Sequence, residues 1–172
     1  MLNFLYCFDE NYNVQGFLSM YSLLEKVDLK IQIYLIHKSQ IDDINIPSKI
    51  LNHKNLKSLA IYKFENKDLN FYNLENAHVS EATFYRLFCT KYLPENLDKI
   101  IYLDADVYCI NNPVPILINS FKKLDSSDYS VSFSTEKYKS EDNTDFQRLQ
   151  LFGNKYFNAG VMLLDLKKTR ED

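Results

Sequence analysis

The strongest constraint on the fold of this chain is the apolar run at residues 100–103, which ends in two aspartates, Asp104 and Asp106. Continuous hydrophobicity of this kind is typical of a strand that is buried on both faces of a parallel sheet. In an extended backbone, residues i and i+2 point to the same face, so both carboxylates are expected to face one point beyond the carboxyl end of the strand. Open α/β sheets bind their ligands at that edge.

Strand-like and helix-like segments alternate along the chain, which predicts an α/β fold with a largely parallel central sheet flanked by helices. The predicted strands are residues 2–8, 31–36, 59–62, 100–103, 129–133 and 156–164. The predicted helices are residues 14–27, 47–51 and 80–92, and a further helix from Lys167. Residues 66–76 and 135–143 are expected to be polar loops, and residues 111–113 a turn. One domain is expected to span residues 1–172.

The composition excludes several classes of protein. With 46% hydrophobic residues among 172, the chain can form a globular core. A net charge of −3 argues against binding to the phosphate backbone of nucleic acids. No apolar run approaches the roughly 18 residues of a membrane span, and residues 1–8 resemble a core strand rather than a signal peptide. The three glycines form neither a GxGxxG motif nor a P-loop.

The cysteines and histidines indicate no metal site of their own. Cys7, Cys89 and Cys109 are widely spaced in apolar surroundings, and they are expected to be buried, reduced thiols. This pattern fits a cytoplasmic protein better than disulfides or a zinc site. His37 and His53 are expected at the surface rather than among ligands.

Two carboxylates that converge after a buried strand suit Mn²⁺ or Mg²⁺, with phosphate oxygens completing the octahedron. This interpretation favours metal-assisted chemistry on a phosphorylated or nucleotide-linked substrate. The alternative is that Asp104 and Asp106 are ordinary turn or cap residues, because aspartate is common after strands. The apolar strand before the pair and the Asn-Asn-Pro turn soon after it favour the metal site.

The loop after the first predicted strand is expected at the same edge of the sheet. Asp9 in this loop is able to accept a hydrogen bond from a base or a ribose hydroxyl, and Tyr12 to stack on a base. Taken alone, a helix cap is the better interpretation of Asp9 and Asn11, because such residues are ordinary at strand–helix junctions.

Arg86 and Gly160 are further candidates. Arg86 lies in an apolar helical stretch, so it requires a partner or a route to solvent. Two interpretations of Arg86 are equally supported. It pairs with Asp104 or with a bound diphosphate, or it extends its charged end to solvent. Gly160, in the sequence Asn-Ala-Gly, predicts a bulge or a close backbone approach within its strand.

Taken together, four segments in this order resemble glycosyltransferase family 8. They are FDENY at residues 8–12, TFYRL at 83–87, KIIYLDADV at 99–107 and YFNAGVMLLDL at 156–166. The family consists of retaining, metal-dependent, nucleotide-sugar glycosyltransferases of the GT-A fold, and it includes bacterial lipopolysaccharide galactosyl- and glucosyltransferases and glycogenin. The resemblance covers nearly the whole chain.

The resemblance implies transfer of a hexosyl group from UDP-glucose or UDP-galactose to a hydroxyl acceptor, a surface polysaccharide or lipid-linked saccharide, with retention of anomeric configuration. Mn²⁺ or Mg²⁺ would be held by Asp104 and Asp106, with Arg86 on the donor-sugar and diphosphate side. The other contacts it implies to nucleotide and sugar are Cys7, Asp9, Asn11, Tyr12, Val79, Ala105, Asn158, Ala159 and Gly160. No nucleophile is assigned, since same-face attack is the simpler expectation.

The chain departs from the family at its end. Family members continue to an Asp-Gln-Asp-type motif and to a His…Gly…Lys-Pro-Trp segment, whose His is the third protein ligand of the metal and whose Lys grips the diphosphate. Neither motif is present. The chain is therefore expected to be a fragment or a truncated product with weakened metal and nucleotide binding. Peripheral membrane contact, if any, would belong to the missing part.

Two alternative functions stay open. The first is a truncated domain that binds a nucleotide sugar but is catalytically weak or inactive. The second is a phosphohydrolase of the haloacid dehalogenase type, which also places Asp-x-Asp after a strand. Such enzymes usually carry the motif near the N-terminus and have Thr or Val where this chain has Tyr108.

Overall fold

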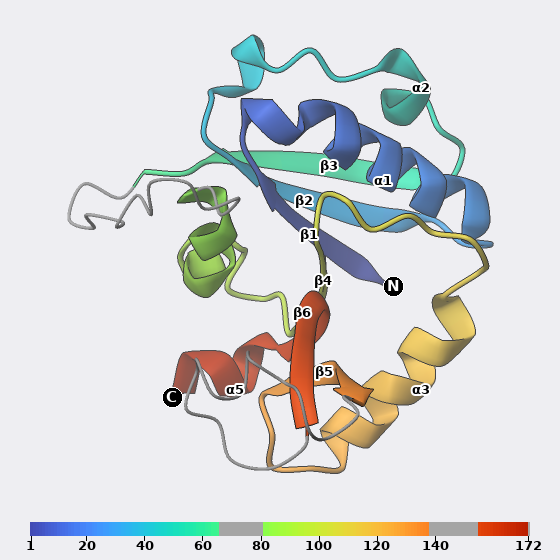
Figure 1. Cartoon of the computed structure of the whole chain (residues 1–172), viewed down its shortest axis with the longest axis vertical. Coiled ribbons are helices and arrows are strands. Elements are labelled where there is room, and N and C mark those ends of the chain that lie inside the picture. The colour runs from blue at the N-terminus through green and yellow to red at the C-terminus, as the bar shows by residue number, and fades with distance from the viewer. Residues whose placement is uncertain (66–80, 138–154, 172) are drawn as a thin grey trace.

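The computed structural model describes residues 1–65, 81–137 and 155–171, which form a six-stranded sheet in the order β3-β2-β1-β4-β6-β5 (Figure 1). The four parallel strands are β1 (Asn3–Phe8), β2 (Ile31–His37), β3 (Leu56–Lys63) and β4 (Lys99–Leu103). Their carboxyl ends share one edge of the sheet. The predicted α/β fold with a largely parallel sheet is confirmed.

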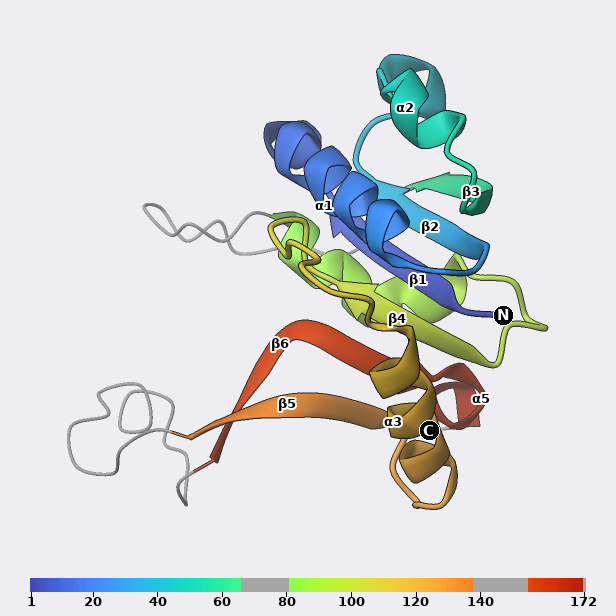
Figure 2. The same cartoon turned by 90° about the vertical axis from the view of Figure 1, so that its right-hand side faces the viewer.

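The remaining strands form the antiparallel side of the sheet. β6 (Lys155–Asp165) runs antiparallel to both of its neighbours, β4 and β5 (Val131–Lys137). In Figure 2, these last two strands extend as a ribbon beyond the others. Pairing between β5 and β6 shifts register next to Phe133, where Met162 is the partner of Phe133 but Asn158 is the partner of Ser134. The irregularity predicted near Gly160 is therefore present.

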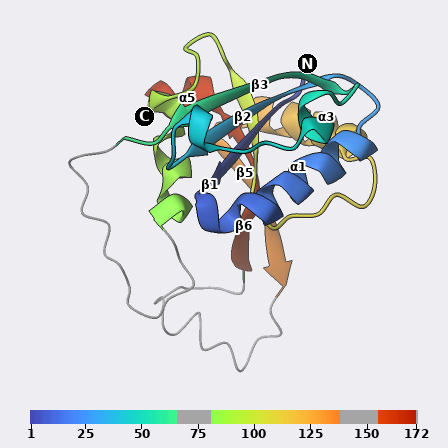
Figure 3. The same cartoon turned by 90° about the horizontal axis from the view of Figure 1, so that it is seen from above.

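Helices cover both faces of the sheet because each buried strand alternates its side chains between two cores. The helices are α1 (Asn13–Lys26), α2 (Ser48–Leu51), α3 (Val114–Asp125), α5 (Leu166–Glu171) and the 3₁₀ helix η3 (Glu81–Lys91). Phe4, Tyr6 and Phe8 of β1 belong to the core under helices α1, α2 and α3, whereas Leu5 and Cys7 belong to the core under η3 and α5. Figure 3 shows these helices on opposite sides of the strands.

Helix α3 was not expected from the sequence, which indicated only a turn at residues 111–113. The turn is followed directly by the helix, whose first backbone N–H, at Val114, donates to Oδ1 of Asn112 over 3.0 Å. Proline at the start of a helix is favourable because its missing N–H is not needed there. Val114, Leu117, Phe121 and Leu124 form the buried stripe of α3.

The helix predicted at residues 80–92 is present as a 3₁₀ helix at residues 81–91, and its buried residues are Ala82, Tyr85 and Cys89. β5 continues to Lys137, whereas a mobile polar segment was expected from residue 135. The loop expected at 66–76, the first residue of the helix expected at 80–92 and most of residues 135–143 lie outside the described residues.

None of the helices within the described ranges is long and apolar enough to cross a membrane.

Candidate active site

Asp104 and Asp106 lie in a turn and not in extended backbone. β4 ends at Leu103, and the N–H of Val107 donates to the carbonyl of Asp104 over 3.2 Å. Leu103 is the last residue of β4 paired with β6, and the Asp104 N–H still donates to the carbonyl of Gly160 over 2.8 Å. The expected strand geometry was therefore wrong, although both carboxylates still reach one pocket.

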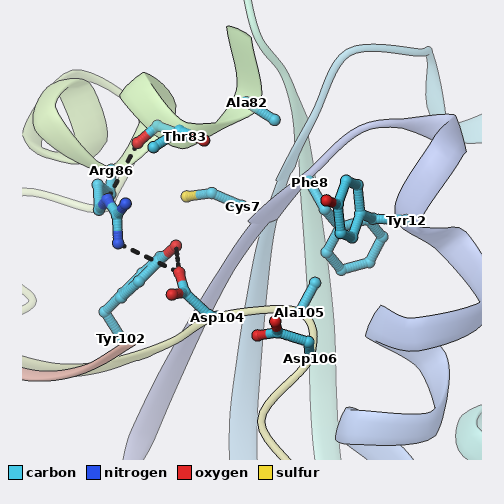
Figure 4. A pocket seen from close by; sticks show the side chains of 10 residues that line it. All are labelled: Cys7, Phe8, Tyr12, Ala82, Thr83, Arg86, Tyr102, Asp104, Ala105 and Asp106. Atoms are coloured by element: carbon cyan, nitrogen blue, oxygen red, sulfur yellow. Dashed lines mark hydrogen bonds and ion pairs between the residues drawn. The ribbon is translucent and has the colours of Figure 1, made fainter. Parts of the chain in front are cut away.

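That pocket, of about 180 Å³, lies at the carboxyl ends of β1 and β4. In Figure 4, Arg86, Tyr102 and Asp104 are grouped on one side, Phe8 and Tyr12 lie on the other, and Cys7 lies between them. The ten lining residues are Cys7, Phe8, Tyr12, Ala82, Thr83, Arg86, Tyr102, Asp104, Ala105 and Asp106.

One carboxylate oxygen of Asp104 is occupied by protein donors. Oδ1 accepts a hydrogen bond from Nη1 of Arg86 over 3.1 Å and another from the hydroxyl of Tyr102. The pKa of Tyr102 is raised, mainly by burial of its side chain, so its hydroxyl keeps its proton and acts as the donor. Oδ2 makes no hydrogen bond or ion pair to the described residues and lies beside Gly160.

Arg86 is held in place by several contacts at once. Its side chain is only 14% exposed, and Nη1 also donates to the carbonyl of Ala159 over 3.1 Å. Nε donates to the carbonyl of Thr83 over 3.0 Å, and the guanidinium lies over the ring of Tyr102 at 4.9 Å. Of the two interpretations of this arginine, pairing with Asp104 is confirmed and snorkelling is wrong.

Asp106 differs from Asp104 because its side chain is exposed and makes no hydrogen bond or ion pair within the described part of the chain. Its turn is attached to α1, where the Ser19 hydroxyl donates to the carbonyl of Val107. The N–H of Cys109 in turn donates to the hydroxyl of Ser22 over 2.9 Å. These bonds hold the backbone that carries the free carboxylate.

The opposite side of the pocket is mainly apolar and aromatic. Phe8 packs edge-on against Phe17 and the imidazole of His37. A Cβ at Gly16 would come within 2.4 Å of the Phe8 ring, so only glycine lets α1 pack this closely. Burial raises the pKa of Cys7 well above its usual value, so this residue lines the pocket as a neutral thiol.

The remaining residues of the predicted nucleotide site that the structure describes do not line this pocket. Asp9 is 5% exposed, and its Oδ1 accepts a hydrogen bond from the backbone N–H of Asn11 over 3.0 Å, which is a helix-cap contact. The side chain of Asn11 is exposed. Oδ1 of Asn158 accepts a hydrogen bond from the Gly160 N–H over 2.8 Å. Val79 lies outside the described residues.

Sequence reasoning missed four lining residues, Phe8, Ala82, Thr83 and Tyr102. Strand alternation was a usable signal for one of them, because Tyr102 and Ile100 share the face of β4 that packs under η3. The contact of Ala82 and Thr83 with the pocket depends on where η3 packs, and that packing has no local signature.

The surface position expected for His37 and His53 is wrong. His37 is fully buried, with Nδ1 accepting from the Ser39 N–H over 3.0 Å and Nε2 at 3.0 Å from Oδ1 of Asn13. Burial lowers the pKa of His37. The side chain of His53 is 8% exposed and lies 2.9 Å from the carboxylate of Glu25. Neither histidine lines the pocket.

The three cysteines are free thiols, as expected. Cys7 and Cys89 are buried, and burial raises the pKa of Cys89 to about 11. Cys109 is partly exposed, so the prediction of burial is wrong for this residue.

The donor atoms in the pocket fit a hard divalent cation. Oδ2 of Asp104 and the carboxylate of Asp106 are oxygen donors of the kind that Mn²⁺ and Mg²⁺ prefer, and these ions take further ligands from phosphate and water. Within the described ranges, no three side chains of His, Cys, Asp or Glu come together as a complete protein-only metal site. The pocket therefore suits an ion shared between protein and phosphate oxygens.

Residues 3–172 match the model of glycosyl transferase family 8. The chain belongs to this family. Among its curated relatives, a putative glycosyltransferase of Haemophilus influenzae is 26% identical over 99% of this chain and 50% of the relative. A lipopolysaccharide 1,2-glucosyltransferase of Escherichia coli K12 is 28% identical over 97% of this chain and 48% of the relative. The chain thus spans about half the length of the curated relatives it matches.

Solved structures of low sequence identity share the fold of this family 8 chain. The galactosyltransferase LgtC, in complex with donor and acceptor sugar analogs, superposes with a TM-score of 0.76 at 22% identity, over 99% of this chain and 60% of LgtC. GlyE of Streptococcus pneumoniae TIGR4 superposes with a TM-score of 0.65 at 19% identity, over 99% of this chain and 35% of GlyE. The fold is GT-A, as the resemblance implied.

Proposed function

We propose that this chain supplies the donor site of a retaining hexosyltransferase. The donor is UDP-glucose or UDP-galactose, and a divalent cation, Mn²⁺ or Mg²⁺, is held by Asp104 and Asp106. The observation that carries this proposal is that both carboxylates and Arg86 line one pocket at the carboxyl edge of the sheet, where α/β folds bind ligands.

The two sides of the pocket suggest how the donor lies. A base needs an apolar, stackable surface, and Tyr12 offers one on the α1 side. A diphosphate needs positive charge, and the bound cation and Arg86 offer it on the β4 side. Asn158, Ala159 and Gly160 are assigned to the donor sugar, since the carbonyls of Ala159 and Gly160 bond to Arg86 and to the backbone of Asp104.

The chemical step is breakage of the bond between the anomeric carbon and the UDP oxygen. When bound, the cation acts as a Lewis acid and stabilises the charge that develops on the departing UDP. Arg86 adds a fixed positive charge, and its contacts with Thr83, Ala159 and Asp104 orient it before the donor binds. Both carboxylates of the pocket are assigned to the metal, so same-face attack by the acceptor hydroxyl remains the proposed route.

The acceptor is proposed to be a surface glycan or lipooligosaccharide. Relatives in two Escherichia coli sources are named lipopolysaccharide 1,2-glucosyltransferases, which supports this substrate class. Family membership also favours sugar transfer over the phosphohydrolase alternative.

Calorimetric titration of UDP into this chain, with Mn²⁺ and then with EDTA, tests the proposal. Binding that requires Mn²⁺ and disappears in the double variant Asp104→Ala/Asp106→Ala would support it. A folded wild-type chain that binds no UDP in the presence of Mn²⁺ would overturn it. Release of UDP from UDP-glucose or UDP-galactose would then distinguish a transferase from a domain that only binds the donor.

A further inference from the structure

We propose that Tyr102 is a positioning residue for the metal site: its buried hydroxyl holds Oδ1 of Asp104 against the protein, which leaves Oδ2 as the oxygen that binds the cation. The proposal rests on the function proposed above, in which Asp104 is a metal ligand. It concerns a pocket-lining residue that is not itself one of the proposed metal ligands.

The position of Tyr102 is set by the sheet. Tyr102 is the second-last residue of β4. It is 1% exposed, and its ring packs in the core under η3. Its hydroxyl points out of this core and donates to Oδ1 of Asp104. A donor that is anchored in a buried strand cannot follow the carboxylate if the carboxylate turns away.

The two oxygens of Asp104 are consequently different. Oδ1 accepts from the Tyr102 hydroxyl and from Nη1 of Arg86, whereas Oδ2 has no donor among the described residues. Gly160 lies against Oδ2, and a Cβ at this position would be only 3.1 Å away. The lack of a side chain at Gly160 therefore keeps the approach to Oδ2 open.

Holding the carboxylate in one orientation should strengthen metal binding, because the rotamer is chosen before the ion arrives. Groups that orient a metal ligand by hydrogen bonding usually contribute about 10–100-fold to metal affinity. Arg86 would still hold Oδ1 if the hydroxyl were removed, so an effect near the lower end of that range, about tenfold, is expected for Tyr102→Phe.

The test compares wild type, Tyr102→Phe and Tyr85→Phe by calorimetric titration of UDP at a series of Mn²⁺ concentrations. Tyr85 is a matched control: it is fully buried in the same core, and its hydroxyl has no hydrogen-bond partner among the described residues. Tyr102→Phe keeps the ring under the Arg86 guanidinium, so the variant is expected to fold, and thermal unfolding checks this.

The expected result for Tyr102→Phe is a half-saturating Mn²⁺ concentration about ten times higher, with UDP affinity at saturating Mn²⁺ like that of wild type. Tyr85→Phe should change neither quantity. A purely structural role would instead lower UDP affinity at every Mn²⁺ concentration. That pattern, or an unchanged Mn²⁺ dependence, would overturn the positioning role while wild-type binding still supports the proposed function. Absence of Mn²⁺-dependent binding in wild type would overturn both.

Discussion

Asp104 and Asp106 stand in the same turn, yet their surroundings are opposite. Asp104 is gripped by Arg86 and Tyr102 through one oxygen, whereas Asp106 is exposed and has no polar partner among the described residues. One carboxylate is oriented by protein donors, and the other has no such donor among the described residues. Conformational freedom lost on binding costs free energy, so the two residues should contribute differently to folding and to binding.

The difference has its origin in the elements on either side of the turn. The Asp104 side touches β6 and η3, which bring the carbonyls of Gly160 and Ala159 and the guanidinium of Arg86. The Asp106 side is hydrogen-bonded to α1, through the carbonyl of Val107 and the N–H of Cys109.

The largest effect is expected for Asp104→Ala. Removing a proposed metal ligand together with its orienting network should lower Mn²⁺-dependent UDP affinity by more than about 100-fold in calorimetric titration. The buried Tyr102 hydroxyl loses its acceptor, which should also lower the free energy of unfolding by about 1–3 kcal/mol in a urea melt. Asp104→Asn is the control: its amide oxygen can still accept from Tyr102, so stability should largely return while metal binding does not. Wild-type binding by Asp104→Ala would contradict the assignment of this ligand.

Asp106→Ala should separate binding from stability. We expect UDP affinity in the presence of Mn²⁺ to fall by about tenfold or more, because a proposed ligand is lost. The free energy of unfolding should stay within about 0.5 kcal/mol of wild type, since the side chain is exposed and unpaired in the described structure. Asp42→Ala, which removes an exposed carboxylate in the 3₁₀ turn Ile41–Asp43, controls for the change in net charge. A loss of stability as large as that of Asp104→Ala would remove the distinction between the two aspartates.

Gly160→Ala adds a methyl group next to Oδ2 of Asp104, the oxygen that has no protein donor among the described residues. The added Cβ would lie 3.1 Å from Oδ2 of Asp104 and 3.1 Å from Oδ1 of Asn158, so one of these side chains must move by a few tenths of an ångström. The half-saturating Mn²⁺ concentration should rise, by less than for Asp106→Ala, because the ligand is displaced and not removed. Unchanged Mn²⁺ dependence would show that Asp104 has more freedom than its contacts indicate.

The smallest effect is expected for Ser19→Ala, which weakens the attachment of the Asp106 turn to α1. Loss of the bond to the Val107 carbonyl should lower the free energy of unfolding by about 1 kcal/mol. The Mn²⁺ dependence of UDP binding should shift slightly, because the carboxylate itself remains. Ser22→Ala is the matched control on the same helix, since its hydroxyl bonds to Cys109, farther along the chain from Asp106. Equal Mn²⁺ dependence in the two variants would mean that the Val107 contact does not orient Asp106.

Much of the scaffold was predictable because its signals are local. The apolar run before Asp104, the helical pattern of residues 14–27 and the strand at 156–164 each lie within one element, and all three are present. The stripe of α3 was equally local, but the Asn-Asn-Pro turn and Pro115 obscured it, since proline inside an apolar segment usually argues against a helix. Pro115 falls in the first turn of α3, where proline is tolerated.

Interactions between elements could not be predicted in the same way. The sequence indicated that Arg86 needed a partner, but the choice of Asp104 depends on where η3 packs relative to β4. It also indicated a bulge or close approach at Gly160, without naming Asp104 as the group approached. Asp9 looked like a helix cap when considered alone, and the cap contact is what the structure contains.

The sequence by itself determined the order of the strands and of the helices other than α3, the placement of an acidic pair after a buried strand, and the family to which the chain belongs. Tertiary structure decided that the pair lies in a turn and that β6 runs antiparallel beside β4. It also decided that, of the two aspartates, Asp104 is the one to which Tyr102 and Arg86 bond. The physical reason is range: propensity and hydrophobic periodicity act between near neighbours in the chain. The inequality of Asp104 and Asp106, by contrast, comes from hydrogen bonds and packing between elements that meet only when the sheet is assembled.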